Sequence, residues 1–377
     1  MITNTDRLGY YLVNGEKFYN KTLALMECKK TNHQLQWIFN DDVYGAIDWT
    51  ISIDTSLSEL YRLRAQQLRD SYDHLVLYFS GGADSMNVLH SFIDNGILLD
   101  EIVMQRPSMV KMNNIDQSAD NFYSEIEYSA KAHLKKYAHK IDPRTAIRES
   151  DLASPTIELL QKDNWFELYP MCTNIALPLL GKQYSYANEN HIKDLCYKGL
   201  KVAQIVGVDK PLVKYDGNNY YAFFNDLSAY HVNFPTEYTA SDVFNKHYRI
   251  EFFYWTPDMP EIVVKQAQEI KQRAEQNNQI KQILRQTESL SLDQLRATLH
   301  PIIYPSKDVE VLFQTKKPNS DIKRKMDDWF WETAGTTASN NYLEVIQYLR
   351  SNIDEHSCID NNIEHGISAH RSPFYKL

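Results

Sequence analysis

The chain has 377 residues, of which 43% are apolar and 24% charged, which is typical of a globular protein with a sizeable core. Its net charge of -9 at pH 7 argues against a protein that binds nucleic acid mainly through charge. No apolar run approaches the roughly 20 residues of a membrane span. The four cysteines form no C-x-x-C pair. We therefore expect a soluble protein of the reducing cytoplasm without a zinc ribbon.

The first 55 residues predict a small α+β module. Asn14 and Gly15 separate two short apolar runs, at 10–13 and 17–19, which is a strong hairpin signal. A short helix over 21–30 follows. These residues carry no chemical motif, so we interpret the module (1–55) as a cap that packs on the rest of the protein.

The middle of the chain alternates between predicted helices and apolar strands. Ser56 and Glu59 match a capping box that begins a helix, and the continuous apolar run 75–79 predicts a strand buried on both faces. A helix over 86–95, ended by Gly96, leads to a second strand. The alternation predicts a doubly wound α/β domain with a mainly parallel sheet. Its remaining predicted elements are strands at 102–104, 139–141 and 202–208 and helices over 118–137 and from 154–155, so that the domain spans 56–211.

Beyond residue 211 the pattern changes. A turn at Asp216-Gly217 lies between two aromatic-rich runs and predicts a hairpin. The aromatic segment 251–258 predicts a strand with core-packing rings, followed by a helix over 261–277. With a further predicted helix over 322–333, we interpret residues 212–377 as a hairpin plus a mainly helical C-terminal region.

One motif carries chemistry: the segment Ser80-Gly81-Gly82-Ala83-Asp84-Ser85, between a predicted buried strand and a helix. Two adjacent glycines let the backbone approach an anion, and the helix directs its free N–H groups at that anion. The hydroxyls of Ser80 and Ser85 add donors. Asp84 would repel a bare phosphate, so its presence indicates a Mg²⁺ between the carboxylate and the phosphates.

This S-G-G-x-D-S stretch resembles the signature of the PP-loop (N-type) ATP pyrophosphatases and matches all six positions. The elements from 56 to 85 are similar to the synthetase domain of asparagine synthetase, whose glutaminase half has no counterpart here. The resemblance implies an adenine nucleotide α-hydrolase-like fold, ATP and Mg²⁺ as cofactors, and cleavage of ATP to AMP and pyrophosphate as a substrate is adenylated. It also implies site residues: Ser80, Gly81, Gly82 and Ser85 for the pyrophosphate, Asp84 for Mg²⁺, and the backbone near Phe79 and Met104 for adenine.

A second candidate is Gly207-Val208-Asp209-Lys210-Pro211, after the last predicted strand of the sheet. Ligands of open α/β sheets bind beyond the carboxyl ends of the strands. There, Lys210 would neutralise the α-phosphate, and Asp209 would bind Mg²⁺ or polarise a nucleophile. A turn that leads into the hairpin explains the same residues equally well, so both interpretations stay open.

Three groups of residues are weaker candidates. Acidic residues early in the helix over 118–137 also suit the helix dipole without any function. A basic and aromatic stretch would suit phosphates or nucleic acid, but a solvated helix face is the simpler explanation. The tail has ligand-type side chains whose spacing matches no standard metal site. These groups are Asp116, Asp120 and Glu125; Lys316, Lys317, Lys323, Arg324, Lys325, Trp329 and Trp331; and His356, Cys358, His365 and His370.

We therefore expect an AMP-forming, ATP-dependent ligase or amidotransferase-like enzyme that acts on a small molecule. One alternative is an enzyme that modifies a nucleic acid or nucleobase, as in tRNA modification or deazaguanine synthesis. Another is an ATP-binding scaffold without turnover, against which the complete loop argues. The pI near 5.8 favours the small-molecule acceptor, whose identity the sequence leaves open. The superfamily often dimerises, so a homodimer is compatible with the resemblance, and no membrane partner is expected.

Overall fold

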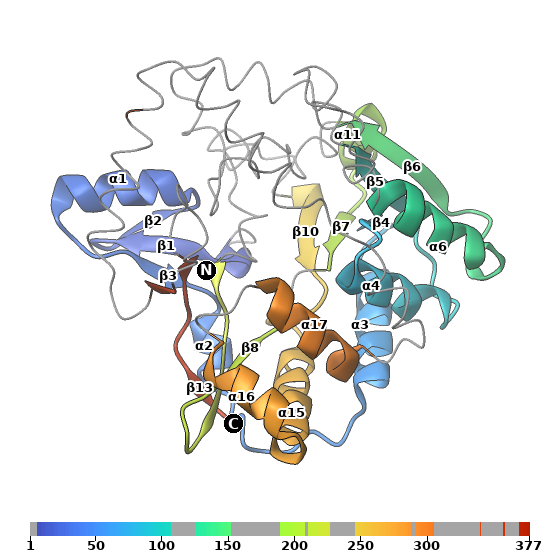
Figure 1. Ribbon diagram of the computed structural model, residues 1–377. Coiled ribbons are helices and arrows are strands. Elements are labelled where there is room, and N and C mark those ends of the chain that lie inside the picture. The colour runs from blue at the N-terminus through green and yellow to red at the C-terminus, as the bar shows by residue number, and fades with distance from the viewer. Residues whose placement is uncertain are drawn as a thin grey trace.

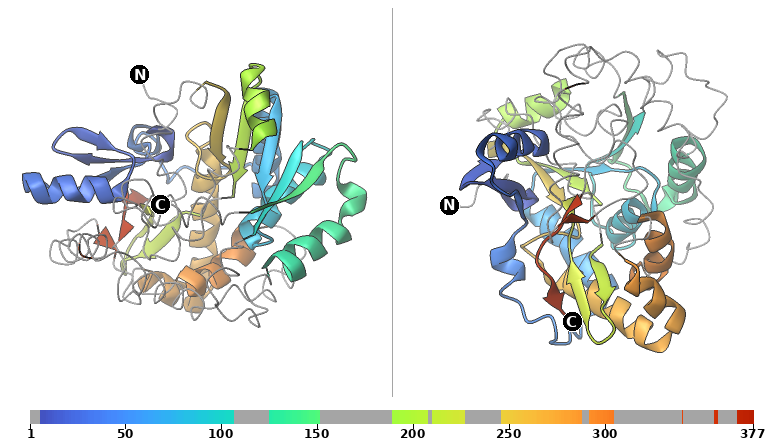
Figure 2. Two further views of the ribbon diagram at one scale, coloured as in Figure 1. Left: turned by 90° about the horizontal axis from the view of Figure 1, so that it is seen from above. Right: turned by 60° about the vertical axis from the view of Figure 1, so that its left-hand side comes forward.

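The computed structural model describes residues 6–106, 125–151, 189–207, 210–226, 246–287, 292–304, 340, 357–358 and 369–377. At its centre lies a five-stranded parallel sheet flanked by helices, which gives the protein α/β character (Figure 1). The strands lie in the order β10-β7-β4-β5-β6, which Figure 2 shows from above, from β10 in gold to β6 in green. They are β4 (His74–Tyr78), β5 (Glu101–Arg106), β6 (Ala146–Asp151), β7 (Val202–Val206) and β10 (Tyr248–Phe252).

The strand order shows how the chain builds this sheet. It starts at β4, adds β5 and β6 on one side, and then returns to add β7 and β10 on the other side. Every residue of β7 is buried, as are Leu75, Val76 and Leu77 of β4. Burial on both faces explains why these strands read as continuous apolar runs instead of alternating patterns, as the sequence predicted.

Helices cover both faces of the sheet. Glu101 and Gln204 both pair with Val76, and Gln204 also pairs with Ile250, so Glu101 and Glu251 point to opposite faces. Glu251 contacts Arg64 of α3 (Leu57–Ser71), whereas Glu101 contacts His191 of α11 (Asn190–Tyr197). The two helices therefore lie on opposite faces of the sheet.

The helices next to β4 begin and end as their residues predict. Ser56 Oγ accepts the Glu59 N–H at 3.3 Å and so caps α3. After β4 comes α4 (Ala83–Ile93), which begins three residues earlier than the sequence indicated. Gly96 follows it with φ +65°, and the Ile97 N–H donates back to the Phe92 carbonyl at 3.0 Å, a glycine-ended helix terminus.

The N-terminal residues form the predicted hairpin. After η1 (Asp6–Leu8), β1 (Tyr10–Val13) pairs with β2 (Glu16–Phe18), and Asn14 and Gly15 both have positive φ at the turn. The sequence did not predict β3 (Gln36–Ile38), which pairs with the other edge of β1. With α1 (Lys21–Thr31) and α2 (Asp41–Tyr44), the region packs on the rest of the core: the Phe39 ring lies 5.4 Å from that of Trp255.

A second antiparallel sheet forms from the predicted hairpin and the end of the chain. It has the order β13-β9-β8, with β8 (Leu212–Tyr215), β9 (Tyr220–Phe223) and β13 (Tyr375–Lys376). A two-stranded pair, β11 (Ser357–Cys358) and β12 (Ala369–His370), lies elsewhere in the tail. Three helices pack together beside α3: α15 (Glu261–Gln276), α16 (Asn278–Arg285) and α17 (Leu292–Ile303). Within the described ranges, each helix is too short or too polar to cross a membrane.

Two strand predictions need correction. Residues 139–141 are not a strand, because η3 (Ala138–Lys140) is a 3-10 helix there and the third strand, β6, comes several residues later. As the edge strand of the sheet, β6 lacks the buried apolar run that marked its neighbours, and its Ile147 is 50% exposed. The aromatic strand starts earlier than predicted, at Tyr248, and joins the parallel sheet through β7. The helices predicted from 154–155 and over 322–333 lie outside the described residues.

Candidate functional site

The loop 80–82 connects the carboxyl end of β4 to the first residue of α4. It lies beside the place where the strand order reverses between β4 and β7. In open α/β sheets such a reversal opens a crevice in which ligands bind. Gly81 has φ +73°, and Gly82 is the extended residue before the helix.

Gly81 has a second reason to be glycine besides its backbone angle. A Cβ there would lie 2.6 Å from the Ala130 nitrogen, which belongs to the π-helix η2 (Glu125–Ala130). The neighbouring Ser129 hydroxyl donates to the Gly81 carbonyl at 2.7 Å. This helix, continued by α6 (Lys131–Lys136), therefore packs directly on the loop and holds its shape.

The two loop serines order the turn from within. Ser80 Oγ accepts the Gly82 N–H at 3.2 Å and lies 3.3 Å from Ser85 Oγ, which donates to the Gly82 carbonyl at 3.1 Å. The first N–H groups of a helix have no acceptor inside it. At the start of α4, these donors and the serine hydroxyls therefore share one small region.

The end of β7 approaches the start of α4 closely. A Cβ on Gly207 would lie 3.1 Å from the Asp84 carbonyl carbon and 3.2 Å from the Ser85 nitrogen. Three residues further on, Lys210 extends its ammonium group to Asp84, with 3.0 Å between Nζ and Oδ1. The lysine side chain is only 4% exposed, while the aspartate retains 22%. Gly207 and Lys210 of the second candidate segment thus lie beside the first.

Two tyrosines and a histidine complete the surroundings of Asp84. The Tyr254 hydroxyl, from the segment after β10, donates to the Asp84 carbonyl at 3.0 Å. At the end of α17, the Tyr304 hydroxyl donates to Asp84 Oδ1, and His300 Nε2 lies 3.7 Å from the same oxygen. Burial raises the pKa of Tyr254 well above its usual value, so this phenol keeps its proton and remains a donor.

The residues predicted beside adenine lie in or directly after strands of the sheet. Phe79 directly follows β4, and its N–H donates to the Val103 carbonyl at 2.9 Å. Met104 lies in β5, two residues before the strand ends. Both side chains are buried, so any contact they make with a nucleotide would come from the backbone.

The other predicted site residues lie at other positions of the fold or outside the described residues. Glu125 begins η2, and Cys358 lies in β11. His370 is buried elsewhere, where its backbone N–H donates to Asp226 Oδ1 at 2.9 Å. The others lie outside the described residues: Val208, Asp209, Asp116, Asp120, Lys316, Lys317, Lys323, Arg324, Lys325, Trp329, Trp331, His356 and His365.

The residues present fit a phosphate group. The glycine-built turn, the serine hydroxyls, the start of α4 and the Lys210 ammonium supply donors and positive charge together. Within the described ranges, no three His, Cys, Asp or Glu side chains are placed to hold a metal ion. A Mg²⁺ here would take Asp84 from this part of the protein and its other ligands from phosphates and water, as is usual for this ion.

Comparison with known proteins adds no family assignment. No protein-family model matches this chain, and no curated protein matches it. The proposed function therefore rests on the geometry of the loop and its neighbours.

Sequence reasoning missed Tyr254, His300 and Tyr304. Tyr304 is 220 positions from Asp84 in the chain, and no local pattern links the two. The aromatic pattern predicts Tyr254 as a core residue, and it is indeed buried. The signal in the sequence is the aromatic segment 251–258, because it runs through the carboxyl end of a strand of the parallel sheet, and such strand ends supply site residues.

Proposed function

We propose that this protein is a PP-loop ATP pyrophosphatase that cleaves ATP to AMP and pyrophosphate and adenylates a small-molecule acceptor. The sheet order supports a doubly wound, adenine nucleotide α-hydrolase-like fold, with the S-G-G-x-D-S loop after the first strand of the sheet. The observation that carries the proposal is the meeting of this loop with Lys210, which comes from the end of the neighbouring strand β7.

In this proposal the loop binds the pyrophosphate end of ATP. The turn at Gly81 and Gly82 lets the phosphates approach the backbone, and the start of α4 provides N–H groups and a favourable dipole. The hydroxyls of Ser80 and Ser85 exchange part of their present hydrogen bonding for phosphate oxygens. Bound Mg²⁺ would neutralise phosphate charge, with Asp84 as its protein ligand.

Lys210 has the second role. Its ammonium group pairs with Asp84 in the structure, and the same reach would let it pair with a phosphate oxygen once nucleotide is present. An oxygen of the acceptor attacks the α-phosphorus, the bond from that phosphorus to the α,β-bridging oxygen breaks, and pyrophosphate leaves with the electron pair. A second nucleophile, such as ammonia or an amine, then displaces AMP from the adenylated acceptor. The protein contributes by positioning the reactants and by neutralising charge that develops in the transition state.

The test is to incubate the protein with Mg²⁺ and α-labelled ATP, with and without a small-molecule metabolite extract. We expect labelled AMP and an equal amount of pyrophosphate, formed only when the extract is present. Asp84→Ala should abolish this product. Asp94→Ala, which alters a partly exposed carboxylate at the other end of α4, is the matched control and should leave it unchanged.

Two results would contradict the proposal. Formation of ADP and phosphate would show that the loop serves a different cleavage. ATP binding without any product, in small-molecule extract and with added tRNA alike, would favour a scaffold without turnover. Formation of AMP and pyrophosphate only when tRNA is added would show that the acceptor is a nucleic acid, and the proposed cleavage of ATP would stand.

A further inference from the structure

Asp84 Oδ1 is contacted by groups from two separate parts of the fold. Lys210 comes from the end of β7, whereas Tyr304 and His300 both come from the last turn of α17 and its following residue. Tyr304 is almost fully buried, with 1% of its surface exposed, and its ring lies 5.2 Å from the His300 ring and 5.6 Å from the Tyr254 ring. Its hydroxyl therefore has a well-defined position beside the carboxylate.

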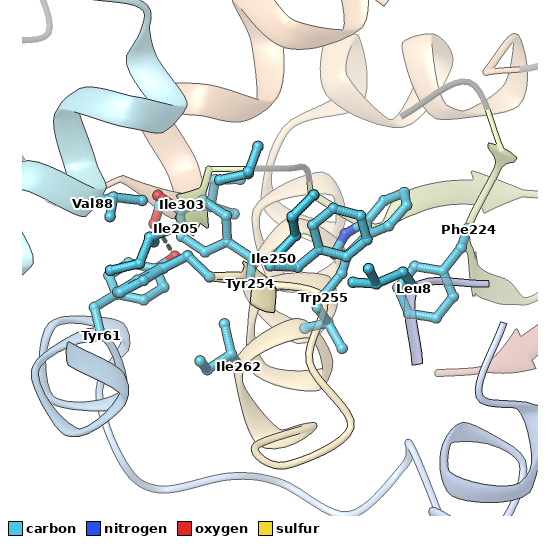
Figure 3. Close-up of a cluster of buried hydrophobic side chains, with 14 of the residues drawn as sticks. Leu8, Tyr61, Val88, Ile205, Phe224, Ile250, Tyr254, Trp255, Ile262 and Ile303 are labelled. Atoms are coloured by element: carbon cyan, nitrogen blue, oxygen red, sulfur yellow. Dashed lines mark hydrogen bonds between the residues drawn. The ribbon is translucent and has the colours of Figure 1, made fainter. Parts of the chain in front are cut away.

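The end of α17 is held in place by two other helices. The Ile303 carbonyl accepts a hydrogen bond from the Tyr61 hydroxyl of α3 at 2.8 Å (Figure 3). The same hydroxyl accepts from Gln266 Nε2 of α15 at 2.9 Å. All three residues are buried, so these hydrogen bonds are costly to break. This series of hydrogen bonds, from Gln266 through Tyr61 to Ile303, holds in place the residue directly before Tyr304.

Phosphate binding would change what Asp84 contacts. A lysine that turns to a phosphate oxygen gives up part of its interaction with the carboxylate. A carboxylate that binds Mg²⁺ must nevertheless keep one orientation, because partners behind a metal ligand commonly change metal affinity by 10–100-fold. The hydroxyl of Tyr304 carries no charge that a phosphate would attract, and α17 is anchored independently of Lys210.

We propose that Tyr304 is a positioning residue that holds the Asp84 carboxylate in its Mg²⁺-binding orientation while Lys210 engages the phosphates. His300 supports this role by packing on the Tyr304 ring. The inference rests on the proposed function, because it needs a nucleotide and Mg²⁺ at the loop. It assigns α17, a helix distant in sequence from the S-G-G-x-D-S motif, to the same site.

The test is the equilibrium binding of α,β-methylene-ATP, which cannot be cleaved between those phosphates, measured by calorimetry over a range of Mg²⁺ concentrations and in EDTA. For Tyr304→Phe we expect the apparent Mg²⁺ affinity of the protein–nucleotide complex to weaken by about 10–100-fold. Affinity in EDTA should stay within about twofold of the unaltered protein. Tyr44→Phe is the matched control, since that buried hydroxyl has no hydrogen-bond partner in the described part of the chain.

The outcomes separate this inference from the proposed function. Unchanged Mg²⁺ dependence in Tyr304→Phe overturns the positioning role and leaves the nucleotide site intact. Equal weakening with and without Mg²⁺, together with a lowered Tm, would show that Tyr304 only supports the fold. Failure of the unaltered protein to bind the analogue under any condition would refute the nucleotide site and this inference with it.

Discussion

The Nζ atom of Lys210 lies 3.0 Å from Oδ1 of Asp84, and this ion pair joins the end of β7 to the first turn of α4. The lysine is nearly enclosed, whereas the aspartate is partly open to solvent. A pair of this kind can be exchanged, because an incoming anion competes for the lysine and a cation competes for the aspartate.

Lys210→Met should lower the rate of AMP formation strongly. It removes a positive charge that faces the reacting phosphates, and losing one such electrostatic contact costs about 10²–10³-fold in kcat. Steady-state assays of AMP release measure this effect. Lys214→Met on β8, whose ammonium lies 5.4 Å from the Phe374 ring, should retain normal kcat. Normal turnover in Lys210→Met would remove this residue from the mechanism.

Gly81→Ala should impair both stability and nucleotide binding. An alanine at positive φ costs about 1–2 kcal/mol, and here its Cβ would also collide with the Ala130 backbone at 2.6 Å. Gly96→Ala has a similar φ but nothing within 4 Å of its Cβ, so it isolates the backbone cost. Urea unfolding should show the larger loss for Gly81→Ala, and only this variant should lose nucleotide binding. Equal losses of stability in the two variants would mean that η2 shifts easily to make room for the added Cβ.

Arg64→Met should be strongly destabilising. Arg64 NH2 lies 2.9 Å from Glu251 Oε2, and both side chains are buried, so the variant leaves the Glu251 carboxylate inside the protein without this ion-pair partner. Removing one partner of such a pair typically costs about 3–5 kcal/mol, and urea unfolding would measure it.

A double variant tests the reason for that loss. Arg64→Met with Glu251→Leu removes both charges and should recover part of the stability. The exposed pair of Arg62 and Glu59 is the comparison, and Arg62→Met should change stability little. A double variant as unstable as the sum of its single variants would show that packing, and not charge, explains the effect.

The thiol of Cys196 should react slowly in the folded protein. Burial raises its pKa to about 11, so at pH 8 very little thiolate is present. Alkylation by iodoacetamide, followed by mass spectrometry of the Cys196 peptide, should be about 10²-fold slower than in the urea-unfolded chain. Equal rates would contradict this burial.

The same shift predicts a pH dependence of stability. A thiol whose pKa is raised by folding contributes stability that is complete below its unfolded pKa of about 8.5 and is lost as pH rises towards about 11. The free energy of unfolding should therefore fall more steeply over this range than in Cys196→Ala. Parallel curves for the two proteins would contradict the assignment to Cys196.

The sequence by itself determined the parts of this protein that depend on neighbours in the chain. The hairpin at Asn14-Gly15, the cap at Ser56 and the buried strand before Ser80 all follow from local backbone preferences and burial patterns. The S-G-G-x-D-S loop could be found for the same reason, since its glycines and serines act within six residues. The prediction of a strand over 139–141 was wrong because the actual edge strand, β6, carries no local apolar signal.

Only the tertiary structure decided what surrounds the loop. The sequence offered Lys210 as a site candidate or as part of a turn, and the return of the strand order to β4 brings this lysine to Asp84. Tyr254 follows β10 and contacts the Asp84 carbonyl, and Tyr304 reaches the Asp84 carboxylate because α17 is anchored by Tyr61 and Gln266. Such contacts depend on how distant elements pack, and residue type or spacing does not encode them locally. The loop can therefore be recognised in the sequence, whereas the contacts that surround Asp84 are set by long-range packing.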